Sequence, residues 1–410
     1  MKNVMFSFQL LANEEKARVG KLITPHGVIE TPAFVPVGTR ATVEALSGED
    51  LLKMGCKVII TNAYHLHLQP GEEIIKKIGG LHRFMAWKGP IITDSGGFQI
   101  FSLGAGKNHG VGKIAPIFPE YGDHGGHFRS KKGKPLVKVH DDGVEFISYL
   151  DGSPHIFTPE RVIGIGEKLG SDIMLVLDEC TSPLHDYHYT RSAMERTHRW
   201  AMQALDKFQR ASHGSQALWG IVQGGAYRDL RQESATFISE LDFSGYAIGG
   251  ALGESKEEMH KVLEWTIPIL PQDKPRHLLG IGYIEDIFDV VMGGIDLFDC
   301  VAPTRLARTG TLLVEKSGER FRIHILNARY RDDSGPIEEV CNCYTCSNYS
   351  RAYLRHLFMA NELLAIRLAA IHNLYFMERL MRQIRTAIKG GRLEALKREW
   401  MRELSSPLEQ

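Results

Sequence analysis

The sequence has few cysteines, no long apolar run and no excess of either charge. Only six of its 410 residues are cysteine, too few for a disulfide scaffold in a chain of this length. No stretch approaches the roughly 20 apolar residues that span a bilayer, and the N-terminus lacks the basic start and apolar core of a signal peptide. We therefore expect a cytoplasmic protein with no membrane segment.

Charge is balanced overall but unevenly distributed. Lys plus Arg and Asp plus Glu both number 49, so net charge gives no indication of a nucleic-acid partner. From Cys341 to the C-terminus, however, 11 basic residues occur against 6 acidic ones. A solvated helix face would have the same composition, so this excess permits RNA binding without requiring it.

Short apolar runs recur along the chain, each followed by a polar residue or glycine and then usually by a helical pattern. Such runs are typical of parallel strands buried on both faces. The expected strands are Phe34–Val37, Val58–Thr61, Ile91–Thr93, Ile173–Leu177, Leu218–Val222, Tyr246–Ile248, His277–Ile281 and Ile295–Phe298. Eight strand–helix units predict an α/β fold, a TIM (β/α)8 barrel. A doubly wound sheet is the alternative, although no G-x-G-x-x-G follows the first strand.

A barrel of this kind carries its chemistry at the C-terminal ends of its strands. From the second strand on, those ends are acids, amides and glycines: Asn62, Asp94, Asp178, Gln223, Gly249-Gly250, Gly280 and Asp299. Carboxylates and amides together match the alternating donors and acceptors on the edge of a purine-like base. Glycines allow a backbone N–H to approach a ligand closely.

Two of these ends carry candidate catalytic groups. Asp94 opens the run Asp94–Gln99, where a carboxylate suited to acid–base work precedes two glycines and the aromatic face of Phe98. Asp299 ends an apolar run and is followed by Arg305 and Arg308. A carboxylate beside cations suits a nucleophile that works next to phosphates, but an acidic strand end paired with Arg305 is an equal alternative.

Two regions depart from the strand–helix pattern. Residues 104–138 are rich in glycine, lysine and histidine and predict a mobile insertion. Its His109, His124 and His127 could bind a metal, but scattered loop histidines usually do not. We expect a catalytic barrel over residues 1–305, and a zinc-binding subdomain with basic C-terminal helices over residues 306–410.

A long amphipathic helix is expected near the C-terminus. Its apolar stripe steps by four and three residues, through Ala370, Leu374, Met377, Met381, Ile384 and Ile388. Basic residues lie off the stripe and are expected to be available to phosphates: Arg379, Arg382, Arg385 and Lys389.

Three cysteines crowd into Cys341-x-Cys343-x2-Cys346, a spacing that can supply three corners of a tetrahedron around zinc. His372 is the first candidate for the fourth ligand and His356 the second. Four protein ligands leave no open position, so one Zn2+ per chain would be structural.

Other features of the sequence are compatible with two further function classes. His65 and His67 at a strand end suggest a zinc-dependent amidohydrolase, which would need further histidines at later strand ends, where none occurs. A non-catalytic RNA-binding module would explain the basic C-terminal region but not three strand-end acids.

The chain resembles the tRNA-guanine transglycosylases, also called queuine tRNA-ribosyltransferases. The resemblance covers nearly the whole chain except the insertion. It is carried by Thr31–Thr39, Thr61-Asn62, Asp94–Gln99, Asp178–Cys180, Val222–Gly225, Phe298–Arg305, the cysteine cluster and His372-Asn373. It implies a zinc-bearing TIM barrel that exchanges the guanine at the anticodon wobble position of certain tRNAs for a 7-deazaguanine base, in queuosine biosynthesis or salvage. No ATP is needed, because one glycosidic bond replaces another.

The resemblance also implies roles for the site residues. Asp299 would attack the ribose and form a covalent ribosyl-enzyme, while Asp94 would protonate the leaving guanine and deprotonate the incoming base. The implied substrate-binding residues are Asp178, Gln223, Gly250, Phe98, Leu279, Asn62, Gln99 and Ser95. Among these, Phe98 and Leu279 would sandwich the base, and Asn62 and Gln99 would steady the nucleophile and the ribose.

Binding partners follow from the same resemblance. Arg305 and Arg308 would bind the nucleotides flanking the target in the anticodon loop, splayed from their stack. The basic zinc region would hold the tRNA backbone in a salt-dependent way and would form a homodimer, with no membrane involved.

Two departures from the family pattern bear on the incoming base. The stretch Gly249–Glu254 is one residue shorter than the usual pattern, and Tyr283 stands where bacterial relatives usually have lysine. These departures favour queuine over 7-aminomethyl-7-deazaguanine (preQ1).

Overall fold

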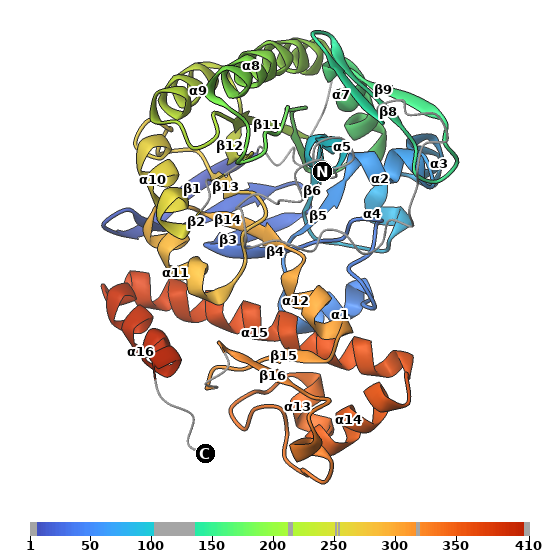
Figure 1. The fold of residues 1–410 in the computed structure, drawn as a ribbon, viewed down its shortest axis with the longest axis vertical. Coiled ribbons are helices and arrows are strands. Elements are labelled where there is room, and N and C mark those ends of the chain that lie inside the picture. Colours follow the sequence, from blue (N-terminus) through green and yellow to red (C-terminus); the bar gives the residue numbers. More distant parts are fainter. Residues whose placement is uncertain are drawn as a thin grey trace.

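The computed structural model describes residues 6–101, 136–211, 216–250, 252, 255–316 and 320–405. At its centre is a parallel sheet of eight strands with helices around it (Figure 1). In spatial order the strands are β4 (Ala33–Pro36), β14 (Leu297–Cys300), β13 (Arg276–Leu278), β12 (Gly245–Ile248), β11 (Ala217–Val222), β10 (Ile173–Leu175), β6 (Ile91–Asp94) and β5 (Ile59–Asn62). A parallel bridge between Val37 and Ile60 joins the two edges. The sheet is therefore a nearly closed barrel, and the eight predicted strands are confirmed.

Helices follow most barrel strands, as the apolar periodicity predicted. They are α1 (Gly48–Met54), α2 (Ala63–Leu68), α3 (Glu72–Ile78), α4 (Leu81–Phe84), α5 (Gly97–Phe101), α7 (Pro159–Leu169), α8 (Tyr187–Arg210), α9 (Arg228–Glu240), α10 (Lys256–Thr266), α11 (Ile284–Met292) and α12 (Ala302–Arg308). The Thr158 side chain caps α7 by accepting from the Arg161 N–H, and Pro159 occupies the first turn, where its missing N–H costs nothing.

A small antiparallel sheet precedes the barrel and was not expected from the sequence. It consists of β1 (Ser7–Glu14), β2 (Ala17–Thr24) and β3 (Gly27–Thr31). Arg18 on β2 forms a buried ion pair with Asp296, which directly precedes β14. The same carboxylate accepts the Arg276 N–H at the start of β13. This sheet is therefore attached to the amino-terminal end of the barrel, opposite the predicted site.

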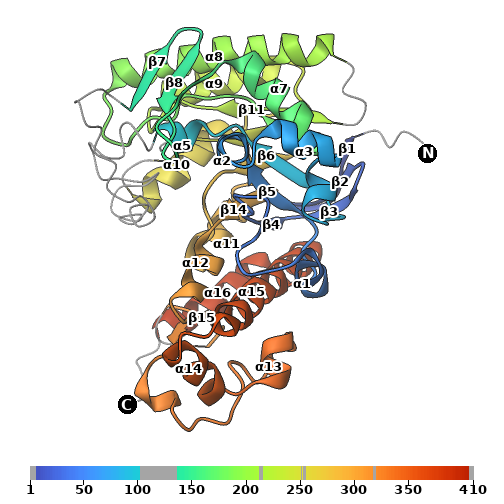
Figure 2. The same cartoon turned by 90° about the vertical axis from the view of Figure 1, so that its right-hand side faces the viewer.

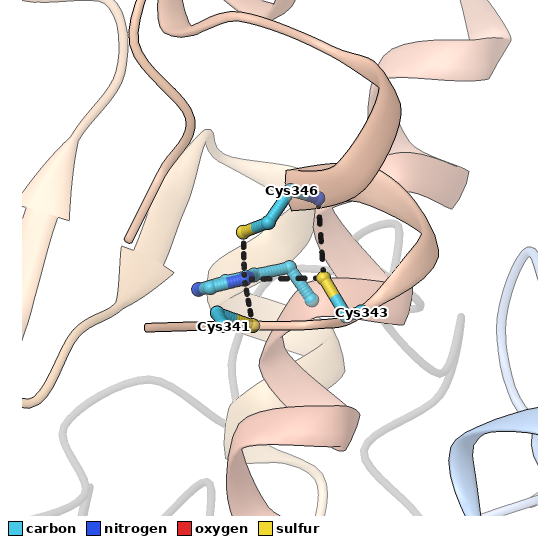
Figure 3. Close-up of side chains that lie close together, drawn as sticks. Cys341, Cys343 and Cys346 are labelled. Atoms are coloured by element: carbon cyan, nitrogen blue, oxygen red, sulfur yellow. Dashed lines mark hydrogen bonds between the residues drawn. The ribbon is translucent and has the colours of Figure 1, made fainter. Parts of the chain in front are cut away.

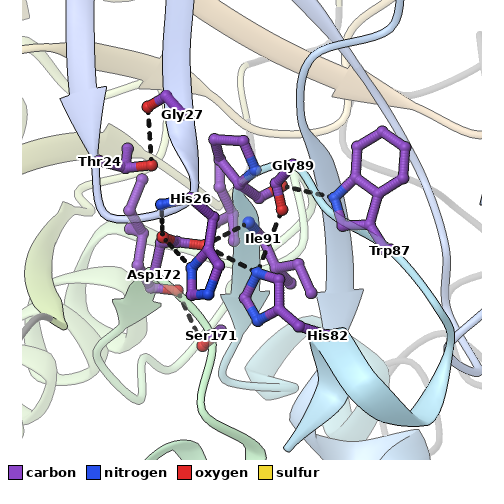
Figure 4. Close-up of polar contacts among 12 residues, drawn as sticks. Thr24, His26, Gly27, His82, Trp87, Gly89, Ile91, Ser171 and Asp172 are labelled. Carbon is purple, nitrogen blue, oxygen red and sulfur yellow. Dashed lines mark hydrogen bonds and ion pairs between the residues drawn. The ribbon is translucent and has the colours of Figure 1, made fainter. Parts of the chain in front are cut away.

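A second buried carboxylate, Asp172, lies at the same end of the barrel (Figure 4). Its side chain is fully buried just before β10, and each oxygen accepts two hydrogen bonds. One oxygen accepts from the backbone N–H and ring Nδ1 of His26, in the β2–β3 turn. The other accepts from the Ile91 N–H and from His82 Nε2 on α4. Asp172 thus connects three segments that are distant in sequence.

Another antiparallel sheet lies between α5 and α7, formed by β7 (Val137–His140), β8 (Gly143–Ile147) and β9 (Pro154–Phe157). Most of the insertion expected at residues 104–138 lies outside the described residues, namely residues 104–135. His109, His124 and His127 belong to this part. At the C-terminal end of the expected insertion, Val137 and Lys138 belong to β7.

The C-terminal region packs on the outside of the barrel (Figure 2). It contains β15 (Thr311–Leu313), β16 (Arg322–His324), η2 (Ala328–Tyr330), α13 (Tyr344–Asn348), α14 (Arg351–Met359), α15 (Leu363–Lys389) and α16 (Leu393–Ser405). The six residues of the predicted apolar stripe are all buried on α15. This helix contacts α1, β4 and α12, and the expected domain boundary at residue 305 falls inside α12.

The expectation that the basic residues of α15 are available to phosphates is wrong for two of them. Arg379 forms an ion pair with Glu338 at 2.9 Å and its side chain is 13% exposed. Arg385 donates to the Pro32 carbonyl at 2.8 Å. Both bonds anchor α15, so neither guanidinium faces solvent phosphates.

Across the described part of the chain, no helix has both the length and the apolarity that crossing a membrane requires.

Candidate active site and metal centre

A pocket opens at the carboxyl-terminal end of the barrel strands. It is lined by Val37, Thr39, Ile60, Thr61, Asn62, Asp94, Phe98, Gln99, Asp178, Cys180, Leu279, Gly280 and Asp299. Three carboxylates, two side-chain amides and four apolar side chains (Val37, Ile60, Phe98 and Leu279) therefore share one cavity. The pocket brings together seven of the ten catalytic and substrate-binding residues that the resemblance implied, and also Gly280, at the end of the barrel where they were expected.

Asp94 lies beside Asn62 because their strands are in register. The two residues are paired across β5 and β6, and Asn62 Nδ2 donates to Asp94 Oδ2 at 2.8 Å and to Gln99 Oε1 at 2.9 Å. Asn62 Oδ1 also accepts the His65 N–H and caps α2. One amide thus anchors a helix with its oxygen and orients a carboxylate with its nitrogen.

Asp299 has different neighbours. His277 Nε2 donates to Asp299 Oδ1 at 2.9 Å, and the Gly280 N–H donates to the same oxygen at 3.3 Å. Asn62, which was expected to steady the nucleophile, donates to Asp94 and to Gln99. Sequence reasoning missed His277, yet a signal existed: His277 is two residues before Leu279, and a strand's two-residue period places both on the face that lines the barrel.

Asp178 is the third carboxylate of the pocket and is buried. Gln223 Nε2 donates to Asp178 Oδ2 at 2.6 Å, and the Cys180 thiol donates to the same oxygen at 3.2 Å. Gln223 itself is not among the pocket-lining residues. An ionised carboxylate accepts hydrogen bonds only, so Asp178 can pair with donors such as the N–H groups of a guanine-like base.

Gly250 lies two residues after the end of β12 and has a backbone φ of +73°. A Cβ at this position would lie 2.0 Å from Gln223 Oε1, so both the backbone conformation and the contact require glycine. The loop that was predicted to distinguish the incoming bases continues through Glu254, and its residues 251, 253 and 254 lie outside the described residues.

Phe98 and Leu279 approach the pocket from different elements, α5 and the loop after β13. Ser95 is buried behind the pocket and accepts the Gly97 N–H at 3.4 Å. Arg305 and Arg308 lie on α12, directly after β14, and Arg308 forms an ion pair with Glu44. The predicted RNA-contacting arginines are thus at the same end of the barrel as the pocket.

Arg231 is a second residue that sequence reasoning missed. It is fully buried on α9 and donates to the carbonyls of Gly225 at 2.6 Å, Val222 at 3.0 Å and Gly249 at 3.0 Å. Burial lowers the pKa of its guanidinium to about 9. It therefore fixes the loops that carry Gln223 and Gly250. A charged residue in the buried stripe with Ala235 and Ile238 was the available signal.

The two histidines of the amidohydrolase alternative do not line the pocket. His65 Nδ1 contacts the Tyr149 hydroxyl at 3.4 Å, and burial lowers the pKa of His65 to about 4. His67 contacts Glu72 at 2.7 Å and His155 at 3.0 Å. Neither belongs to a group in the described residues that could hold a metal ion, so the arrangement does not support a metal-dependent hydrolase.

Cys341, Cys343, Cys346 and His372 form a separate, buried cluster in the C-terminal region (Figure 3). The three sulfurs lie 3.8, 3.6 and 3.3 Å from His372 Nδ1. A tetrahedral zinc with its usual bond lengths would separate sulfur and nitrogen ligands by about 3.5 Å, so the residues fit one ion. His356 on α14 is outside this group.

The orientation of the His372 ring also fits a metal ligand. His372 Nε2 donates to the Leu313 carbonyl at 2.6 Å, which leaves the Nδ1 lone pair facing the sulfurs, as in other histidine ligands held by a backbone carbonyl. A bound ion would connect the loop at residues 341–346 to α15. The four-ligand set has no open position, so its contribution would be structural.

Comparison with known proteins gives a consistent result. A family model described as queuine tRNA-ribosyltransferase matches residues 13–406. A putative queuine tRNA-ribosyltransferase of Archaeoglobus fulgidus is 51% identical over 96% of this chain and 98% of its own. The queuine tRNA-ribosyltransferase of a Roseiflexus species is 47% identical over 97% of this chain and 98% of its own. That of Caldanaerobacter subterraneus is 48% identical over 95% of this chain and 94% of its own.

Proposed function

This chain belongs to the queuine tRNA-ribosyltransferase family and is a pentosyltransferase, and we propose that it exchanges the wobble guanine of tRNA for a 7-deazaguanine base through a covalent ribosyl-enzyme. The observation that carries the mechanism is the pair Asp94 and Asp299, which face one pocket with different hydrogen-bond partners. Two carboxylates in distinct environments suit a double displacement at an anomeric carbon.

In the first half of the exchange, Asp299 attacks ribose C1′ and the C1′–N9 bond breaks. Its electron pair leaves with guanine, which takes a proton from Asp94. In the second half, Asp94 removes a proton from the incoming base, whose nitrogen attacks C1′ and releases Asp299. Phe98 and Leu279 would cover the two faces of the base.

Recognition of the base is assigned to Asp178, Gln223 and Gly250. Asp178 would accept from the N–H groups of the base. To donate to the base carbonyl, the Gln223 amide would turn away from Asp178, to which its Nε2 atom donates at 2.6 Å. Ser95 supports the turn that carries Phe98.

For the incoming base we favour queuine over preQ1. Tyr283 lies against Arg322, with the guanidinium 5.0 Å from its ring centroid, and is not among the pocket-lining residues. The preference therefore rests on the shortened loop after Gly250 and not on Tyr283.

The tRNA would lie across the pocket mouth, with Arg305 and Arg308 against the nucleotides that flank the target. Breaking the Arg308–Glu44 ion pair costs little, because Glu44 is 53% exposed. One Zn2+ in the cysteine cluster, a homodimer and a cytoplasmic location complete the proposal.

The test combines guanine exchange with covalent trapping. Full-length protein is incubated with radiolabelled guanine and an anticodon hairpin with a wobble guanosine, and RNA-linked protein is resolved on a denaturing gel. Wild type should incorporate guanine and form the adduct, whereas Asp299→Asn should do neither. Full exchange by Asp299→Asn would overturn the nucleophile assignment, and competition by queuine and preQ1 in separate reactions decides the incoming base.

A further inference from the structure

We propose that His277 is a positioning residue that holds the carboxylate of Asp299 and stabilises the charge it regains when the ribosyl-enzyme breaks down. The inference rests on the proposed role of Asp299 as nucleophile. The two residues are hydrogen-bonded across neighbouring strands, β13 and β14.

The hydrogen bonds that Asp299 accepts from the described residues all reach one of its two carboxylate oxygens. His277 Nε2 at 2.9 Å and the Gly280 N–H at 3.3 Å both donate to Oδ1. No hydrogen bond to Oδ2 is found among the described residues. Because the two donors occupy one oxygen and fix the plane of the carboxylate, Oδ2 is the atom directed to substrate. Preorganised orientation of this kind lowers the barrier to attack.

Burial makes the His277 contact strong. The side chain of His277 is 0% exposed and that of Asp299 is 15% exposed, so water competes little for the bond. A carboxylate cannot donate, so the shared proton is assigned to Nε2. A charge-assisted bond in such surroundings is about twice as strong as a neutral one.

The other contacts of His277 do not explain why a histidine is present. Its Nδ1 has no hydrogen-bond partner among the described residues. The edge of its ring meets the Trp219 ring, at a centroid distance of 6.4 Å and an angle of 83°. An apolar side chain would satisfy that packing without burying an unpaired nitrogen. The bond to Asp299 is therefore the interaction that accounts for the imidazole.

The chemistry assigns His277 mainly to the second half of the exchange. In the ribosyl-enzyme, Asp299 is a neutral ester through Oδ2, and Oδ1 is its carbonyl oxygen. When the incoming base bonds to C1′, the C1′–Oδ2 bond breaks and its electron pair stays on Oδ2. Asp299 is then again a carboxylate with a charge of −1. Hydrogen-bond donors stabilise the carboxylate more than the ester, so His277 makes Asp299 a better leaving group.

The experiment compares variants that remove or keep the donor. His277→Phe fills the space without a donor, and His277→Gln places an amide N–H near the position of Nε2. The full-length variants are reacted with the anticodon hairpin, and the covalent adduct is chased with excess guanine. Losing one preorganised donor should slow adduct breakdown by about 100-fold, so adduct should accumulate in His277→Phe, with little change in KM for the hairpin.

The controls separate positioning from packing. Trp219→Phe changes the same core without touching Asp299 and should leave breakdown near the wild-type rate, while His277→Gln should restore breakdown to within about tenfold of it. Should His277→Phe not fold, His277→Asn replaces it, because its amide is too short to reach Oδ1. Equal rates for the Phe, Asn and wild-type proteins, or equal slowing by Gln and Phe, would overturn the inference. Absence of any adduct in wild type would instead overturn the proposed function.

Discussion

Asn62 and Asp94 end adjacent strands in register, and the Asn62 amide nitrogen donates to Asp94 at 2.8 Å while its oxygen caps α2. The two functions of this side chain can be separated. Asn62→Asp keeps a capping oxygen but removes the donor and places a second carboxylate against Asp94. We expect kcat for guanine exchange to fall by about 100-fold, while the free energy of unfolding changes by less than about 1 kcal/mol.

The matched control for this variant is Ser47→Asp, which replaces the cap of α1 far from the pocket and should leave kcat unchanged. Steady-state exchange and urea unfolding measure the two quantities. If Asn62→Asp retained full kcat, the amide would matter only as a helix cap.

The buried guanidinium of Arg231 should control affinity for the base. In the wild type three separate nitrogens of the guanidinium each reach a different carbonyl. The single ammonium nitrogen of Arg231→Lys cannot occupy all three positions, so it leaves buried acceptors on the loops that carry Gln223 and Gly250. We expect a loss of about 3 kcal/mol in unfolding free energy and a KM for guanine at least about tenfold higher. Arg228→Lys on the exposed start of α9 is the control. An unchanged KM in folded Arg231→Lys would show that the two loops keep their geometry without it.

The cysteine cluster should bind zinc in the purified protein. Cys343→Ser should reduce zinc from one equivalent per chain to near zero, and should lower the unfolding free energy by at least about 4 kcal/mol, because the loop loses its attachment to His372. Elemental analysis and thermal unfolding test this. Cys56→Ala changes a buried cysteine outside the cluster and should keep the metal. Zinc retained by Cys343→Ser would exclude this ligand set.

Glu378 on α15 should make stability depend on pH. Burial raises the pKa of its carboxyl to about 7, against the lowering effect of Arg385 and Arg382. Because the folded pKa lies above the unfolded one, the group's stabilising contribution is complete below about pH 4 and is lost as pH rises through about 7. Between pH 5 and pH 8 the free energy of unfolding should thus fall by about 2 to 3 kcal/mol more in the wild type than in Glu378→Gln. If urea unfolding gave the same change in unfolding free energy with pH for both proteins, this prediction would be wrong.

Exposed apolar side chains in the C-terminal region provide a test of the proposed homodimer. Leu363 is 82% exposed, Val340 70% and Met359 59%, and such groups mark protein interfaces when they are clustered. Leu363→Glu should convert a dimer to a monomer in light scattering, whereas Leu11→Glu on β1, also at an exposed site, should not. A wild-type monomer at micromolar concentration would refute the dimer.

The sequence alone predicted the eight strands of the barrel, because each parallel strand is buried on both faces and is therefore a short apolar run followed by a polar end. The same rule located Asp94, Asp178 and Asp299, since parallel strands bring their C-terminal ends to one edge. The cysteine spacing indicated a metal cluster, and α15 was visible as one apolar stripe. These features depend on local pattern and chain direction, which a sequence contains.

Only the tertiary structure decided which polar groups meet. Arg379 and Arg385 lie off the apolar stripe like solvated residues, yet their long side chains reach Glu338 and the Pro32 carbonyl across other elements. The contacts of His277 with Asp299, Arg231 with three carbonyls and Arg18 with Asp296 join residues on different strands or helices. Hydrogen bonds are short and directional. A sequence pattern therefore predicts on which face of a helix or strand a residue lies, but not with which residue it forms a hydrogen bond.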